Sequence, residues 1–105
     1  MISNQVLDEV ARRIVENFHP EKIILFGSQA RGTADNHSDV DLLVISAINE
    51  TRRKLMVDMR RVLDKLEYAF DVIVLTREEF ERDRKIPGTV GRYASKDGKV
   101  IYERS

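Results

Sequence analysis

The chain has 105 residues, of which 18 are Lys or Arg and 18 are Asp or Glu, so its formal net charge is zero. This balance gives no argument for a nucleic-acid partner or an anionic membrane surface, and the absence of cysteine excludes disulfides and thiolate chemistry. No apolar run approaches the ~20 residues that a membrane helix needs, and the opening residues, MISNQ, do not resemble a signal peptide. We therefore expect one cytoplasmic domain over residues 1–105, without membrane association.

The first half of the chain reads as a helix followed by two apolar strands. Apolar residues recur at every fourth position between 2 and 18, which predicts an amphipathic helix that Ser3 or Asn4 could cap and that Pro20 would end. The elements expected next are a buried strand over 22–26, a short helical turn over 28–31, a polar loop over 33–38 and a second strand over 39–45.

The second half begins with a helical apolar stripe, which predicts a long helix over 51–68. A strand over 71–75 follows, and then a short helix with Thr76 as its N-cap and Glu79 in the capping-box position. The remaining expectations are a break at Pro87 and Gly88, a turn over 96–99 and an edge strand over 100–102.

The most informative stretch is GSQARGTADNHSDVDLLV, which contains Gly27 and Ser28, a ten-residue spacer, and then Asp39 and Asp41. Strand side chains alternate between faces, so the two carboxylates point to the same side of the sheet. Carboxylates in an apolar strand are unfavourable unless a cation pairs with them. The glycine lets backbone approach a phosphate closely, and the serine opens a helical turn that offers its hydroxyl and N–H groups. Together these residues indicate metal-dependent chemistry on a nucleotide.

Asp71 opens the third expected strand and gives a further carboxylate. If this strand neighbours the second, Asp71 lies beside Asp39 and Asp41, because adjacent strands are roughly 4.8 Å apart. Three such carboxylates repel one another when empty and suit Mg²⁺, which prefers oxygen ligands and takes some of them from substrate phosphates.

These motifs resemble the nucleotidyltransferase superfamily that includes DNA polymerase beta, and more closely its minimal nucleotidyltransferases, the MNT proteins. The segments FGSQARG, SDVDLLV, YAFDVIVL and GRYASKDGKVIYER carry the resemblance, which extends over nearly the whole chain. It implies an α/β (α+β) nucleotidyltransferase fold, a small mixed sheet with helices mainly on one face. It also implies that Asp39, Asp41 and Asp71 are catalytic metal ligands and that Gly27 and Ser28 hold the triphosphate.

The resemblance further implies two Mg²⁺ ions, with Mn²⁺ as an alternative, and ATP as the substrate whose AMP is transferred to a hydroxyl. Because the chain has no length left for an acceptor domain, the acceptor surface is expected from a second subunit or from the target. MNT antitoxins pair with a HEPN-type toxin and are implicated in adenylylating it, and such a toxin is the expected partner here.

Alternatives remain for both the function and the individual residues. The chain could be a small-molecule transferase similar to the aminoglycoside-modifying branch, or a non-catalytic module that neutralises a partner by contact alone. Taken singly, Gly27 and Ser28 could form an ordinary turn, Asp39 and Asp41 could pair with arginines, and Asp71 could be a solvated strand start. Arg31 could neutralise phosphate or form a surface salt bridge.

Overall fold

The computed structural model describes residues 2–34 and 39–105, so most of the expected polar loop over 33–38 lies outside the described residues. The order of elements along the chain is α1 (Asn4–Phe18), β1 (Lys22–Phe26), α2 (Ser28–Arg31), β2 (Val40–Ile45), α3 (Arg52–Arg61), β3 (Phe70–Leu75), α4 (Arg77–Asp83), α5 (Val90–Asp97) and β4 (Lys99–Glu103).

The four strands form one mixed sheet in the order β3-β2-β1-β4. β1 pairs antiparallel with β2 and with β4, whereas β2 and β3 run parallel. The carboxyl end of β1 therefore lies beside the amino ends of β2 and β3. The expectation of a small mixed sheet is confirmed. The second and third strands are neighbours, which is the condition on which the predicted position of Asp71 depended.

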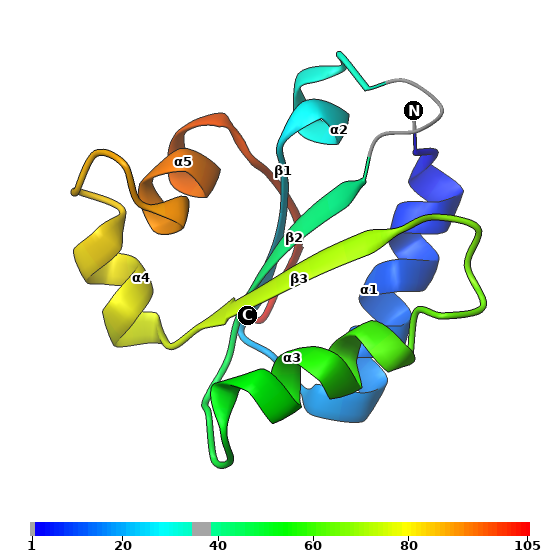
Figure 1. The fold of residues 1–105 in the computed structure, drawn as a ribbon, viewed down its shortest axis with the longest axis horizontal. Coiled ribbons are helices and arrows are strands. Elements are labelled where there is room, and N and C mark those ends of the chain that lie inside the picture. Colours follow the sequence, from blue (N-terminus) through cyan, green and yellow to red (C-terminus); the bar gives the residue numbers. More distant parts are fainter. Residues whose placement is uncertain (1, 35–38) are drawn as a thin grey trace.

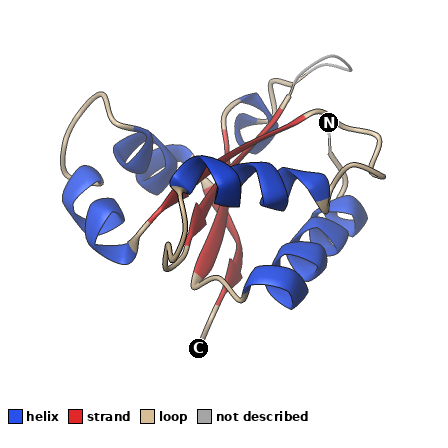
Figure 2. Ribbon diagram, turned by 60° about the horizontal axis from the view of Figure 1, so that its bottom comes forward, coloured by secondary structure: helices blue, strands red, loops and turns tan. Residues whose placement is uncertain are grey.

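Helices cover the two faces of the sheet unequally. The two longest helices, α1 and α3, pack on one face with the alternate strand residues that include Leu25, Leu42 and Val72. The shorter α4 and α5 pack on the opposite face through Phe80 and Ala94. Figures 1 and 2 show the sheet between these two groups of helices. The long helices share one face as expected, and α4 and α5 add a partial second layer.

Two of the helix starts follow the expected capping chemistry. Ser3 caps α1, since its hydroxyl accepts a hydrogen bond from the Val6 N–H at 3.2 Å. Thr76 and Glu79 form the expected capping box at α4, each accepting from the backbone N–H of the other. Side-chain oxygens satisfy helix N–H groups that have no partner inside the helix.

The helix expected over 51–68 is too long, because α3 ends at Arg61. The Val62 carbonyl accepts a hydrogen bond from the Arg13 guanidinium at 3.1 Å, and the Leu66 N–H turns back to the Leu63 carbonyl instead of continuing the helix. Leu63 remains fully buried. The apolar stripe therefore continues beyond Arg61 because these side chains are buried, although the backbone there is no longer helical.

The helix α5 was missed in the sequence, where only a turn over 96–99 was expected. Thr89 caps its start by accepting from the Arg92 N–H at 3.1 Å, and the helix runs to Asp97 before Gly98. Its buried positions, Gly91 and Ala94, are too few and too small to give a clear helical stripe. Over the part of the chain that is described, no helix has the length and apolar character to cross a membrane.

Candidate active site

Three carboxylates lie at one end of the sheet. Asp41 pairs in parallel register with Asp71 of the neighbouring strand, so the two side chains leave the sheet side by side on the same face. Asp39 lies two residues before Asp41, immediately before β2, and is exposed like Asp71. The structure thus places at one end of the sheet the three acidic residues that the sequence singled out.

The backbone of Gly27 lies against the Asp41 carboxylate. Gly27 follows β1 directly, with φ +76° and ψ −158°, and forms the N-cap position of α2. A Cβ built on Gly27 would lie only 2.2 Å from Asp41 Oδ2, so the missing side chain is what allows the carboxylate to approach the backbone. Ser28 begins α2 at this point. The predicted glycine turn therefore lies directly against Asp41.

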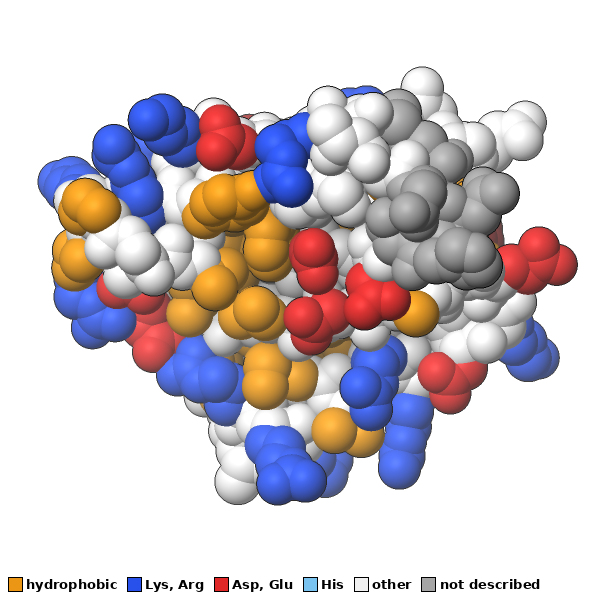
Figure 3. All heavy atoms as spheres, turned by 45° about the horizontal axis from the view of Figure 1, so that its top comes forward, with side chains coloured by type: hydrophobic (Ala, Val, Ile, Leu, Met, Phe, Trp, Pro, Cys, Tyr) orange, Lys and Arg blue, Asp and Glu red, His pale blue; other side chains and the backbone are white. Residues whose placement is uncertain are grey.

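The negative charges of Asp39 and Asp71 disfavour ionisation of Asp41. Partial burial, followed by the charges of Asp71 and Asp39, raises the pKa of the Asp41 carboxyl above its usual range, and only Arg31 opposes the shift. Within residues 2–34 and 39–105, none of the three aspartates forms an ion pair within 4 Å. The reading of these acids as arginine-paired strand ends is therefore not supported there. Figure 3 shows acidic side chains gathered on one face beside apolar surface.

The donor set suits a hard cation such as Mg²⁺, since carboxylate oxygens are its preferred protein ligands. As the side chains are placed, however, no three acidic or histidine residues of the described chain converge to form a metal cage. The Coulombic effect of Asp71 and Asp39 on Asp41 still shows that the carboxylates are close enough to repel. A cation at this end would relieve that repulsion, and Mg²⁺ commonly completes its coordination with water and substrate phosphates.

Two flanking residues complete the site. Arg31, at the end of α2, places its guanidinium 5.7 Å from the centroid of the Tyr93 ring. It forms no ion pair with the described residues, so the surface salt bridge, one of its two alternatives, is not found there. Gln29 was not singled out in the sequence. It is 3% exposed, and its Oε1 accepts a hydrogen bond from the Ile2 N–H at 2.8 Å. This buried hydrogen bond connects α2 to Ile2, just before α1.

Comparison with known proteins shows the family of the chain. The family model described as "Nucleotidyltransferase domain" matches residues 7–97. The chain belongs to this nucleotidyltransferase family. Two relatives from Methanocaldococcus jannaschii are both named "Putative protein adenylyltransferase". The first is 44% identical over 69 residues, which is 64% of this chain and 45% of the relative. The second is 32% identical over 83 residues, 78% of each chain. The match thus spans less than half of the first relative's length.

Solved nucleotidyltransferase structures share the fold. A toxin-antitoxin complex with AMP-PNP superposes with a TM-score of 0.73 at 19% identity, covering 94% of this chain and 74% of that one. An MNT antitoxin in complex with a tri-AMPylated Shewanella oneidensis HEPN toxin gives a TM-score of 0.67 at 16% identity, covering 97% and 74%. At these identities the likeness concerns the fold, which is the expected nucleotidyltransferase fold.

Proposed function

We propose that this nucleotidyltransferase transfers AMP from ATP to a hydroxyl group of a partner protein, in a reaction that depends on Mg²⁺ or Mn²⁺. The observation that carries the proposal is the register that sets Asp41 beside Asp71 and against Gly27. At this end of the sheet two carboxylates lie side by side next to a glycine turn, in a chain that matches the family over residues 7–97.

The proposal gives each residue a role. Asp39, Asp41 and Asp71 hold the cations, which neutralise phosphate charge and align the reacting oxygens when bound. Gly27 admits the triphosphate close to the backbone, and Ser28 offers its hydroxyl and N–H to the phosphate oxygens. Asp71 is exposed and can accept the proton of the acceptor hydroxyl, whose oxygen bonds to the α-phosphorus as pyrophosphate leaves.

The proposed acceptor is a HEPN-type toxin, which would make this chain an antitoxin. Two observations support this partner: the relatives' names refer to protein adenylyltransferases, and a neighbour of the same fold is complexed with an AMPylated HEPN toxin. The acidic end also remains open beyond α4 and α5, since Asp39 and Asp71 are exposed. A docked protein can therefore reach it and supply the missing wall of the site.

Intact-mass spectrometry of the partner tests the proposal. The chain is co-expressed with a HEPN-type toxin, and the purified pair is incubated with ATP and Mg²⁺. We expect the partner to gain the mass of one or more AMP groups. Asp39→Ala/Asp41→Ala should abolish this gain, as should chelation of the metal with EDTA.

A matched control separates loss of the site from loss of two surface charges. Asp64 and Glu67 are also exposed acids and take part in no side-chain interaction with the described residues, so Asp64→Ala/Glu67→Ala should leave the transfer unchanged. If the partner gains no mass with the unaltered chain, and Asp39→Ala/Asp41→Ala still neutralises its toxicity, the protein acts by contact alone.

A further inference from the structure

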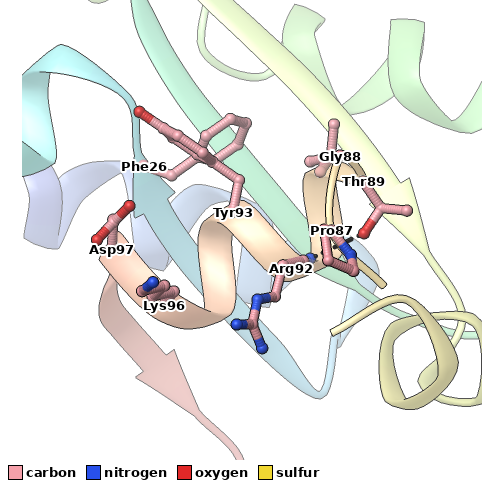
Figure 4. Close-up of a pocket in the computed structure, with 9 residues that line it drawn as sticks. Phe26, Pro87, Gly88, Thr89, Arg92, Tyr93, Lys96 and Asp97 are labelled. Carbon is pink, nitrogen blue, oxygen red and sulfur yellow. Dashed lines mark hydrogen bonds between the residues drawn. The ribbon is translucent and has the colours of Figure 1, made fainter. Parts of the chain in front are cut away.

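A hollow of about 550 Å³ lies between Phe26 at the end of β1, the segment that joins α4 to α5, and α5 itself. Its apolar walls come from Phe26, Pro87, Val90 and Tyr93. Figure 4 shows Pro87 and Thr89 on one side of the hollow and the two aromatic rings on the other, with α5 between them. This volume is within the usual range of small-ligand sites, which are mostly apolar with a few polar groups at the edge.

The hollow adjoins the candidate active site through Phe26. Phe26 is the last residue of β1, pairs in register with Asp41 and directly precedes Gly27. Its ring meets the Tyr93 ring edge-to-face, with centroids 6.2 Å apart and planes at 75°. The guanidinium of Arg31 also lies over the Tyr93 ring, and the positive charge of Arg31 acts to lower the pKa of Asp41. The aromatic wall thus begins where the proposed phosphate site ends.

α5 also sets polar groups at the edge of the hollow. Tyr93, Lys96 and Asp97 lie on one side of the helix because residues three and four apart are neighbours. Lys96 and Asp97 are exposed and form no salt bridge with the described part of the chain. Their ammonium and carboxylate groups are therefore available to a ligand as a hydrogen-bond donor and acceptor.

We propose that this hollow is the subsite for the nucleobase of the substrate triphosphate and that it takes a purine. The inference rests on the proposed function, because it assumes that the triphosphate lies at the Gly27 turn. A planar two-ring base covers more of the Phe26 and Tyr93 surface than a pyrimidine does, and stacking on an aromatic side chain stabilises a bound base. Asp97 and Lys96 can then pair with the amino and acceptor groups of the base edge.

Binding measurements in the presence of Mg²⁺ test the subsite. Tyr93→Ala should weaken ATP binding roughly tenfold to a hundredfold, the range that removal of one stacking partner gives. Binding of inorganic tripolyphosphate, which has no base, should not change. Tyr93→Phe is the matched control, because it keeps the ring and should bind ATP within about twofold of the unaltered chain. The unaltered chain should also bind CTP more weakly than ATP.

Photolabelling with azido-ATP provides a test that needs no variant. We expect the label on Phe26 or on residues 87–97. A label elsewhere, equal affinity for CTP and ATP, or unchanged ATP binding by Tyr93→Ala would overturn the subsite. A loss of partner affinity without a loss of ATP affinity in Tyr93→Ala would assign the hollow to the acceptor instead. If the unaltered chain binds neither ATP nor tripolyphosphate, the proposed function itself fails.

Discussion

Substitution of Gly27 by alanine tests the contact between the turn and the acidic group. Its backbone, at φ +76° and ψ −158°, lies in a region that is essentially restricted to glycine and costs another residue about 1–3 kcal/mol. The added Cβ would also lie 2.2 Å from Asp41 Oδ2, and forcing that side chain off its rotamer costs about 0.5–1.5 kcal/mol. Alanine also lowers the conformational entropy of the unfolded chain, which stabilises the folded state by about 0.4–1 kcal/mol.

These contributions give a net loss of about 2 kcal/mol in the free energy of unfolding for Gly27→Ala, within a range of roughly 0.5–4 kcal/mol. Urea unfolding followed by circular dichroism measures it, since the chain has no tryptophan to report by fluorescence. Gly88→Ala is the matched control, because Gly88 has φ +90° but no atom within 4 Å of its built Cβ. It should lose about 1 kcal/mol or less, since only the left-handed backbone is penalised.

A double variant isolates the clash. Asp41→Ala removes the carboxylate that the new Cβ would meet, so Gly27→Ala should cost about 0.5–1.5 kcal/mol less in that background than in the unaltered chain. If Gly27→Ala destabilises no more than Gly88→Ala, and its effect is the same with and without Asp41, the close approach of this turn to the carboxylate is refuted.

Three further outcomes are expected. Because the folded-state pKa of Asp41 is raised, the unaltered chain loses stability relative to Asp41→Asn as pH rises above the ordinary carboxyl pKa, and the two converge below it; urea unfolding in EDTA from pH 3 to 7 measures this. Glu79→Gln keeps the capping box but loses the ion pair with Arg52 at 2.7 Å, so it should cost about 1 kcal/mol or less at pH 7 for this partly exposed pair. The loss should disappear as pH falls from about 4.5 to about 2, because the ion pair lowers the pKa of Glu79 to about 2. Gly98→Ala should lower the melting temperature, since its Cβ would lie 2.5 Å from Ile24 Cγ2 in the core, at a cost of about 1–3 kcal/mol.

The strands and their acids could be predicted from local pattern. β1 and β2 are mostly apolar runs, and the alternation of side chains places Asp39 and Asp41 on one face without knowledge of the fold. The adjacency of Asp71 needed an assumption about strand order, which the parallel register of β2 and β3 confirmed. The roles of these residues stay predictions, because their placement alone does not test what they bind.

The segments that the sequence missed depend on tertiary contacts. α3 ends at Arg61 partly because Arg13, which is distant in the sequence, donates a hydrogen bond to the Val62 carbonyl. α5 exists largely because α4 packs against it, with Gly91 so close to Asp83 that a Cβ would lie 2.8 Å from the Asp83 Cβ. No local periodicity encodes either contact. The hollow between Phe26 and α5 was invisible in the sequence for the same reason.

The open end of the sheet follows from the cost of burying charge. On the face that carries Asp41, α4 and α5 cover apolar positions such as Ile24 and Leu43, whereas Asp39 and Asp71 stay exposed. An apolar cover over these carboxylates would remove them from water without a compensating partner, which costs several kcal/mol for each ion. Any molecule that closes this end must therefore bring cations or hydrogen-bond donors. A nucleotide with its metal ions meets that requirement, and a protein that docks here should cover the acids only when such a cation is already bound.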